Sequence, residues 1–324
     1  MPTPLVLVVG GAGYIGSHMV KLLLGSDYRT ITLDNLSTGY RDAVLGGEFM
    51  QVDLADRPAL DRLFAQRSID AVMHFASFIQ VGESVKEPAK YYENNVTNTL
   101  NLLDSMVAHG IKRFIFSSSA AVYGNPITVP IPEDHPKHPI NPYGRTKWMV
   151  EQILDDYDRA YGLKSVSLRY FNAAGADPGG QLGERHEPET HLIPLILRAA
   201  SGRAPDIKVF GRDYDTPDGT CIRDYVHVAD LCDAHRLALD QLLDGGVSAV
   251  YNLGNGNGFS VAEVIAATER VTGRNIPVTD VARREGDPPR LVANATRART
   301  ELGWQPQFNE LDAIIAHAWA WECK

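Results

Sequence analysis

The chain has 324 residues, of which 44% are hydrophobic and 22% charged, and its formal net charge at pH 7 is −9. A chain of this length can bury a large core and form more than one lobe. Because the charge is negative and no basic run is present, we expect neither nucleic acid nor a membrane surface as a partner. No apolar run approaches the ~20 residues of a membrane span. The apolar N-terminus also lacks the basic segment of a secretory signal.

The three cysteines, Cys221, Cys232 and Cys323, are widely spaced and odd in number. They indicate neither a disulfide framework nor a metal site, and we expect no metal. This use of cysteine is typical of a reducing compartment, so we expect a cytoplasmic protein.

The stretch Leu5–Gly16 predicts a buried strand, a glycine-rich turn and the start of a helix. Five branched apolar residues, Leu5–Val9, suit a central strand of a parallel sheet. The following glycines have the spacing of a dinucleotide fingerprint, which places a pyrophosphate at a helix N-terminus. Asp34 closes the next expected strand 18 residues after Gly16, where a carboxylate contacts an adenosine ribose and favours NAD over NADP. The alternative is a tight turn in which Asp34 caps a local backbone group.

The first half of the chain alternates strand and helix patterns, which predicts a doubly wound parallel α/β sheet of the Rossmann type. Further strands are expected over residues 48–52, 70–75, 113–118 and 165–169. Long helices are expected over residues 88–109 and 143–161. The proline-rich loop 125–142 is expected to border a site.

Beyond about Phe171 the pattern changes to clustered turn residues, shorter helices and isolated strands. We therefore expect a dinucleotide-binding domain over residues 1–170 and a smaller α/β substrate lobe over residues 171–324. Segments near residues 223–253 are expected to return to the first domain.

Tyr143 and Lys147 are four residues apart at the start of an expected helix, so their side chains share one face. A lysine ammonium there is expected to lower the pKa of the phenol from ~10. Ser119, at a strand end, can hydrogen-bond the same substrate oxygen. The three side chains predict proton removal from a secondary alcohol coupled to hydride transfer. Such a Tyr–Lys pair is also common on ordinary helix surfaces, and the upstream glycine fingerprint favours the catalytic interpretation.

Taken along the chain, these motifs resemble the extended short-chain dehydrogenase/reductases, and most closely the UDP-glucose 4-epimerase family. The resemblance runs nearly end to end, and three of its motifs, VGESV, DGT-x-x-RDY and RREGD, are specific beyond the superfamily. The matching stretches are Gly10–His18, Asp34–Leu36, His74–Ala76, Val81–Val85, Tyr91–Asn95, Phe114–Tyr123, Pro142–Gln152, Leu168–Asn172, Asp218–Val228, Tyr251–Gly254 and Arg283–Asp287.

The resemblance implies that Tyr143 is the acid/base, that Lys147 activates it and contacts the nicotinamide ribose, and that Ser119 binds the sugar 4-hydroxyl. It implies NAD as cofactor, held by Gly10, Gly13, Tyr14, Ile15, Gly16, Asp34, Asn35, Asp53, Leu54, Phe75, Ala76, Asn94, Ser117, Tyr143, Lys147 and Phe171. It implies a UDP-sugar substrate that contacts Ser119, Tyr143, Asn172, His191, Leu192, Arg223, Arg284, Asp287 and Leu291.

The reaction implied is the interconversion of UDP-glucose and UDP-galactose, a step of galactose metabolism. Tyr143 would take the C4 hydroxyl proton while hydride passes to tightly held NAD⁺. The 4-keto sugar would then turn before hydride returns to its opposite face. The resemblance also implies a homodimer that pairs the two long helices.

Several alternatives stay open. A bulky tyrosine at the position of Leu291 excludes N-acetyl sugars in the family and small residues admit them, so a UDP-N-acetylhexosamine or UDP-pentose is an alternative substrate. An NAD-dependent nucleotide-sugar dehydrogenase or reductase would share Tyr143 and Lys147, and an inert NAD-binding scaffold would share the fold. His191 is as well explained as a structural residue. Arg223, Arg284 and Asp287 could equally be solvated surface residues.

Overall fold

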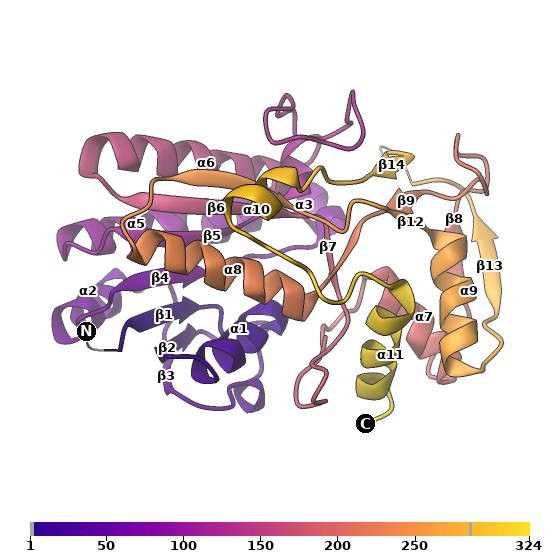
Figure 1. Cartoon of the computed structure of the whole chain (residues 1–324), viewed down its shortest axis with the longest axis horizontal. Coiled ribbons are helices and arrows are strands. Elements are labelled where there is room, and N and C mark those ends of the chain that lie inside the picture. Colours follow the sequence, from indigo (N-terminus) through magenta and orange to yellow (C-terminus); the bar gives the residue numbers. More distant parts are fainter. Residues whose placement is uncertain (1–2, 285–286) are drawn as a thin grey trace.

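The computed structural model describes residues 3–284 and 287–324, and its centre is a seven-stranded sheet (Figure 1). Residues 285–286, which belong to the predicted motif Arg283–Asp287, lie outside the described part. All neighbouring strands of the sheet are parallel. In sheet order the strands are β11 (Ala249–Leu253), β6 (Lys164–Tyr170), β5 (Arg113–Ser119), β4 (Ala71–His74), β1 (Leu5–Val9), β2 (Arg29–Asp34) and β3 (Glu48–Gln51). The predicted doubly wound parallel sheet is confirmed.

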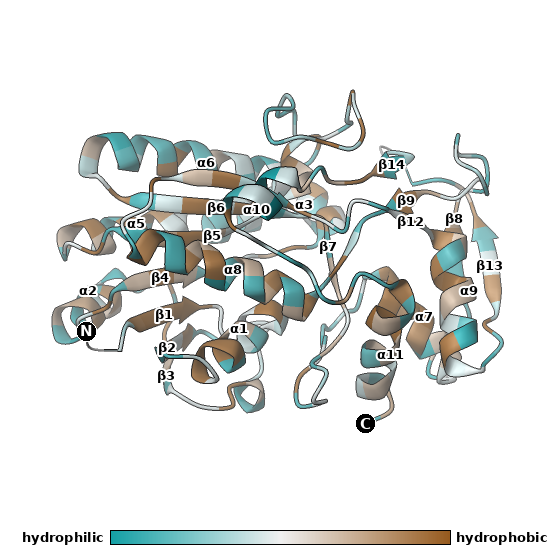
Figure 2. Ribbon diagram, in the orientation of Figure 1, coloured by the Kyte–Doolittle hydropathy of each residue, from teal (hydrophilic) through white to brown (hydrophobic). Residues whose placement is uncertain are grey.

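Helices cover both faces of this sheet, because alternate residues of its strands point to opposite sides. Val6 and Val8 of β1 pack on one side, with α1 (Tyr14–Leu24), α8 (Val228–Leu243) and α10 (Thr296–Glu301). Leu5, Leu7 and Val9 pack on the other, with α2 (Arg57–Gln66), α5 (Asn98–Ala108) and α6 (Pro142–Tyr161). Figure 2 shows the central strands in brown and much of the outer surface of α6 in teal. Both faces of the sheet are therefore apolar cores.

The strand order reverses between β1 and β4. From β1 the chain moves outward through β2 and β3, and it then returns to β4 and continues through β5 and β6 to β11. In doubly wound folds ligands bind at the carboxyl ends of the strands beside such a reversal. The glycine turn after β1 and Phe75 after β4 lie at this edge, so the topology places them together.

The helix expected over residues 88–109 is interrupted. α4 (Pro88–Tyr92) and α5 flank a π-helical turn, Glu93–Thr97. Within this turn the side chain of Asn95 accepts a hydrogen bond from the amide of Phe78 (2.9 Å) and donates to its carbonyl (3.0 Å). A short helix, α3 (Val81–Lys86), precedes α4. π-turns widen a helix locally and are frequent at functional sites.

The second half of the chain builds a smaller core and also completes the sheet. The smaller core contains α7 (Leu192–Ala200), α9 (Val261–Thr272) and α11 (Leu311–Glu322), beside the parallel pair β8 (Ile207–Phe210) and β13 (Val278–Val281). Its other strands are β7 (Asn172–Ala174), β9 (Ile222–Arg223), β10 (Tyr225–His227), β12 (Phe259–Ser260) and β14 (Arg290–Leu291). α8 and β11 return to the large sheet, where β11 pairs with β6. None of the described helices has the length and apolar character needed to span a bilayer.

Candidate active site

A cavity of about 840 Å³ opens at the carboxyl ends of the central strands, between the sheet and the smaller core. This volume is at the upper end of the range of small-molecule sites. The predicted site residues that line it are Gly10, Gly13, Tyr14, Ile15, Gly16, Asp34, Asn35, Asp53, Leu54, Phe75, Ala76, Asn94, Ser119, Tyr143, Phe171, Asn172, His191, Arg223, Asp287 and Leu291.

The glycine turn needs its glycines for space. Gly10 has φ +79°, and a Cβ there would lie 2.5 Å from the backbone nitrogen of Ala76. A Cβ on Gly16 would lie 2.1 Å from the carbonyl oxygen of Gly10. The turn therefore packs tightly on itself and on the end of β4. It delivers the N-terminus of α1 to the cavity, where backbone N–H groups and the helix dipole favour an anion.

Asp34 has a local role as well as a place in the cavity wall. Its Oδ2 accepts a hydrogen bond from the amide of Ala12 (2.9 Å), and its Oδ1 accepts one from the amide of Leu36 (2.8 Å). Burial raises the pKa of Asp34, and the two hydrogen bonds from the backbone offset only part of this rise. The neighbouring Asn35 donates to Asp53 Oδ2 (2.8 Å). The carboxylate of Asp34 thus fixes the glycine turn. Asp34 therefore both caps local backbone groups and faces the cavity.

Tyr143, Lys147 and Ser119 come together as predicted. The side chain of Asn141 caps α6 by accepting from the amide of Gly144 (2.8 Å), which starts the helix at the cavity. Ser119 and Tyr143 both line the cavity, and the hydroxyl of Ser119 lies near enough to the phenol to lower its pKa. The ammonium of Lys147 lies 5.8 Å from the centre of the Tyr143 ring. The phenol and the serine hydroxyl can therefore share one substrate oxygen.

Lys147 does not line the cavity but lies behind it, 2% exposed. Its Nζ donates to Ser77 Oγ and to the carbonyl of Ser117, each at 2.8 Å. Ser117 also misses the cavity wall, because its hydroxyl pairs with His235 Nε2 at 2.9 Å. The side chain of Ser117 does not face the cavity, so the structure does not support the predicted contact of Ser117 with the cofactor. The carbonyl of Ser117 positions Lys147 instead.

The expected effect of Lys147 on Tyr143 is wrong for this structure. Burial raises the pKa of Tyr143, and the hydrogen bond from Ser119 works against that rise. Burial lowers the pKa of Lys147 to about 7, although the carboxylate of Glu151 opposes this. Desolvation disfavours the charged form of both groups.

We expect Ser119→Ala to move the acid limb of the pH–rate profile to higher pH. The hydrogen bond from Ser119 lowers the pKa of Tyr143, so its loss leaves more of the phenol protonated at any given pH. Because the base form is the phenolate, the rate near neutral pH should fall by about 10-fold or more. Steady-state rates between pH 5 and 10 measure both effects. An unchanged limb would show that Ser119 does not act on Tyr143.

On the sugar side, Arg223 and Asp287 form an ion pair at the cavity wall. Arg284 does not reach the cavity, because its guanidinium stacks on the ring of Phe210, 3.9 Å from the centroid. Leu192 also misses the wall, since it opens α7 and packs against the smaller core. Of the two predicted arginines, the structure therefore brings Arg223 to the cavity and leaves Arg284 outside it.

His191 lines the cavity and is also held structurally. Its Nδ1 lies 2.9 Å from Oε1 of Glu184 and 2.9 Å from Oε1 of Glu189. These carboxylates raise the pKa of His191 to about 10, against the opposing effect of burial. The imidazole is therefore a cation at neutral pH, beside the place expected for a sugar.

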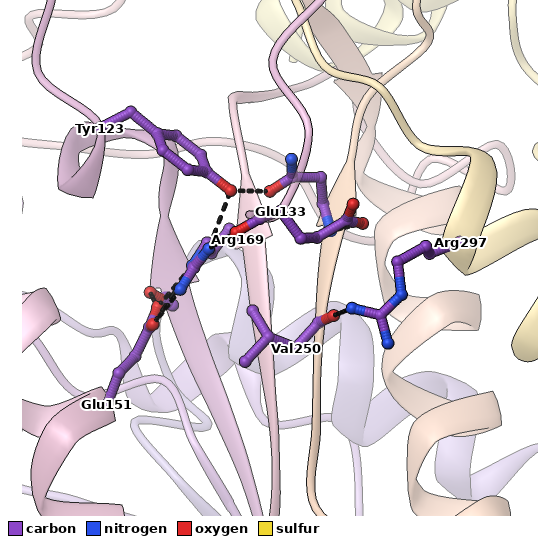
Figure 3. A network of polar contacts seen from close by, with 8 residues as sticks. Tyr123, Glu133, Glu151, Arg169, Val250 and Arg297 are labelled. Atoms are coloured by element: carbon purple, nitrogen blue, oxygen red, sulfur yellow. Dashed lines mark hydrogen bonds and ion pairs between the residues drawn. The ribbon is translucent and has the colours of Figure 1, made fainter. Parts of the chain in front are cut away.

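A buried polar network stands behind the site and was not predicted. Figure 3 shows Arg169 of β6 between Glu151 of α6 and Tyr123. Arg169 Nε and Nη2 donate to the two oxygens of Glu151 (2.9 and 2.5 Å), and Nη1 donates to the Tyr123 hydroxyl (2.9 Å). Arg169 Nη1 also donates to the carbonyl of Glu133 in the proline-rich loop (3.0 Å). The network joins the sheet, α6 and the loop that borders the cavity.

A glycine turn at the strand-order reversal, facing a Tyr–Lys–Ser group at the start of a helix, defines the class of extended short-chain dehydrogenase/reductases. The family model described as "NAD dependent epimerase/dehydratase family" matches residues 6–254. The chain belongs to this family.

Individual relatives match nearly the whole chain. A UDP-glucose 4-epimerase from Rhizobium leguminosarum bv. trifolii is 54% identical over 319 residues, 98% of this chain and 97% of that protein. The crystal structure of UDP-glucose 4-epimerase from Brucella ovis in complex with NAD has a TM-score of 0.96 at 51% identity, covering 98% of this chain and 97% of that one. The UDP-glucose 4-epimerase from Bifidobacterium longum in complex with NAD⁺ and UDP has a TM-score of 0.93 at 40% identity, covering 98% of both chains.

Proposed function

We propose that this protein interconverts UDP-glucose and UDP-galactose by inverting C4 of the sugar, as part of galactose metabolism, with NAD held in the same cavity. The observation that carries the proposal is the group formed by Tyr143 and Ser119. It lies in one cavity wall with the glycine turn on one side and Arg223 on the other. The relatives of about 50% identity named as UDP-glucose 4-epimerases support it.

The residues at the glycine turn fit NAD. The turn packs too closely for a Cβ on Gly10 or Gly16, and this close packing brings the N-terminus of α1, which suits a pyrophosphate, to the cavity. The carboxylate of Asp34, already fixed by two amides, can accept from a ribose hydroxyl and repels a 2′-phosphate. When bound, NAD supplies a reversible hydride acceptor for C4. We assign residues 1–170 to NAD and residues 171–324 chiefly to the nucleotide sugar.

In this proposal Tyr143 takes the proton of the C4 hydroxyl and later returns it to the same oxygen. Ser119 holds that oxygen by a hydrogen bond and supports the phenolate. Lys147, fixed by Ser77 and the carbonyl of Ser117, lies behind the phenol and supplies a positive charge there only when its amine is protonated. A positive charge beside Tyr143 lowers the pKa that burial has raised, so base strength depends on the loaded state of the site.

We assign the diphosphate of UDP to Arg223. Its guanidinium reaches the cavity, and two N–H groups in a fork match the oxygens of a phosphate. Asp287 occupies part of this fork in the structure, so the substrate has to displace the carboxylate or share the arginine with it. Arg284 joins the site if it leaves the ring of Phe210. Firm contacts to UDP and few contacts to the sugar would let the 4-keto sugar rotate within the site.

Leu291 supports a second candidate substrate. This side chain lines the cavity and is partly buried against the apolar cluster that holds Tyr123. Leucine leaves more room than tyrosine, so a UDP-N-acetylhexosamine can fit where a UDP-hexose does, and a UDP-pentose is smaller still.

We expect Leu291→Tyr to lower activity on UDP-N-acetylgalactosamine by about 10-fold relative to UDP-galactose, because the larger ring removes space beside the sugar. Differences of this size are typical of apolar pockets, at ~1–3 kcal/mol per methylene. The ratio of kcat/KM for the two substrates is the measurement. If the ratio is unchanged, Leu291 does not select the sugar.

Exposed apolar side chains on two neighbouring helices support a homodimer. α3 packs against α6, and Val81 and Val85 of α3 and Met149 of α6 are 46%, 62% and 41% exposed. Such a patch is a common site of association between chains. Sedimentation velocity distinguishes one chain from two.

We also assign the protein to the cytoplasm. Cys221 and Cys232 are buried free thiols and Cys323 is an exposed one, which suits a reducing compartment.

The decisive experiment gives purified protein UDP-galactose without added cofactor. The proposal expects UDP-glucose to appear with no net NADH, because NAD is reoxidised within each turnover. Stoichiometric release of NADH with an oxidised sugar would instead identify a dehydrogenase. Bound NAD with no change in the sugar would identify a scaffold.

A further inference from the structure

Four side chains in the segment between β7 and α7 form a compact group beside the catalytic residues. Glu184, His186, Glu189 and His191 each offer one ligand atom, and these four atoms lie within 4.8 Å of one another. The three cysteines indicate no metal site, and His191 by itself is as well explained as a structural residue. The overlooked signal is the spacing Glu-x-His-x-x-Glu-x-His over residues 184–191.

The distances within the group match the edges of a coordination shell. Nδ1 of His191 lies 2.9 Å from Oε1 of Glu184 and 2.9 Å from Oε1 of Glu189. Nδ1 of His186 lies 3.2 Å from Oε1 of Glu184 and 3.6 Å from Oε2 of Glu189. Four ligands at the usual bond length of zinc are about 3.3 Å apart in a tetrahedron. Closing these atoms around one ion therefore needs small movements.

Burying the two carboxylates of this group costs free energy unless positive charge compensates them. The side chains of Glu189 and Glu184 are 1% and 7% exposed, so two carboxylates are withdrawn from water. Two positive charges are needed beside them, which either two imidazolium ions or one divalent cation supplies. Among the described residues, His186 Nδ1 is buried and makes no well-formed hydrogen bond, although the Glu184 oxygen is near. Two imidazolium ions thus satisfy the group incompletely.

The chain holds the ligands in place from outside the group. Oε1 of Glu189 also accepts hydrogen bonds from the amides of Thr190 (2.7 Å) and His191 (2.8 Å). The ring of His186 meets the ring of Tyr14 edge-on, with centroids 6.2 Å apart. Such outer contacts orient ligands and are a regular feature of metal centres.

We propose that Glu184, His186, Glu189 and His191 bind one divalent transition-metal ion, with zinc the best match. Two imidazole nitrogens and two carboxylates form a donor set that suits zinc and its neighbours and is poor for magnesium, which prefers oxygen ligands alone. Four protein ligands leave no open position, so the ion has a structural role. Glu184, His186 and His191 lie in the cavity wall, and a bound ion fixes this wall on the sugar side. The site does not depend on the proposed reaction.

The test titrates the full-length protein, first stripped with a chelator, with Co²⁺ and then with Zn²⁺. The proposal expects one Co²⁺ per chain, with the visible d–d absorption of a low-coordinate site, and its displacement by one equivalent of Zn²⁺. Bound zinc should also raise Tm. Separate Glu184→Gln and His191→Gln variants preserve side-chain size, and each should weaken zinc binding by more than about tenfold. Circular dichroism and NAD content report whether each variant is folded.

His109→Ala serves as the matched control. His109 lies near Asp61 on another face of the protein, so its loss should leave metal uptake unchanged. Uptake below one equivalent per chain, or uptake that persists unchanged in both Glu184→Gln and His191→Gln, would overturn the proposal. The group would then be a metal-free pair of imidazolium–carboxylate bridges.

Discussion

Tyr143→Phe should reduce turnover of UDP-galactose by about 10²–10⁴-fold, the range typical of losing a general acid/base. The change removes the phenol hydroxyl that lies beside Ser119 at the cavity wall and leaves the ring that packs there. The glycine turn and Asp34 are untouched, so the variant should still purify with NAD. The measurements are the epimerisation rate and the NAD content of the same preparation.

Tyr157→Phe is the matched control for this experiment. Tyr157 lies on the same helix, and its hydroxyl donates a hydrogen bond to Asp104 on the exposed side of α6. The same atom is removed from the same helix without touching the cavity, so turnover should be preserved. Activity in Tyr143→Phe within tenfold of the control would show that another group moves the proton.

The sequence was sufficient for the sheet because its signals are local. The inner strands β1 and β4 are short, fully buried segments, and the fingerprint after β1 identifies the edge that carries the site. The π-helical turn at Glu93–Thr97 was not predictable in this way. It depends on Asn95 meeting the backbone of Phe78 from another element.

The pKa values of the site residues were harder to predict than which residues form the site. Spacing places Tyr143 and Lys147 on one helix face, but their pKa values depend on how deeply the folded chain buries them. The same holds for Arg284, whose position follows from the ring of Phe210, 74 residues earlier in the sequence. Identity of a residue is local information, whereas burial and partners arise from long-range packing.

The network around Arg169 shows how such packing supports α6. Glu151 lies on α6 one turn beyond Lys147 and two beyond Tyr143. Arg169 of β6 fixes Glu151 by two parallel hydrogen bonds, with the two side chains 3% and 4% exposed. Ser118, next to Ser119, donates to the same carboxylate (2.5 Å). A single buried ion pair thus sets the position of α6 against the strand that carries Ser119.

Arg169→Met should therefore lower the free energy of unfolding by about 3–5 kcal/mol, because it leaves the buried charge of Glu151 without its ion-pair partner. The double variant Arg169→Met/Glu151→Met should recover part of this loss, since neither charge remains. Recovery should be incomplete, because Tyr123 and the carbonyl of Glu133 also lose the arginine. Denaturant unfolding of the wild type, both single variants and the double variant gives the coupling energy.

Arg159→Met is the control for the loss of an arginine. Arg159 pairs with Asp155 on the outside of the same helix, where the side chains are 71% and 61% exposed. Its removal should change the free energy of unfolding by less than about 1 kcal/mol, as for other exposed pairs. A loss of similar size in Arg169→Met and Arg159→Met would mean that the buried pair does not hold α6. If Arg169→Met loses much more unfolding free energy than Arg159→Met, the activity of folded Arg169→Met shows how strongly catalysis depends on the buried pair.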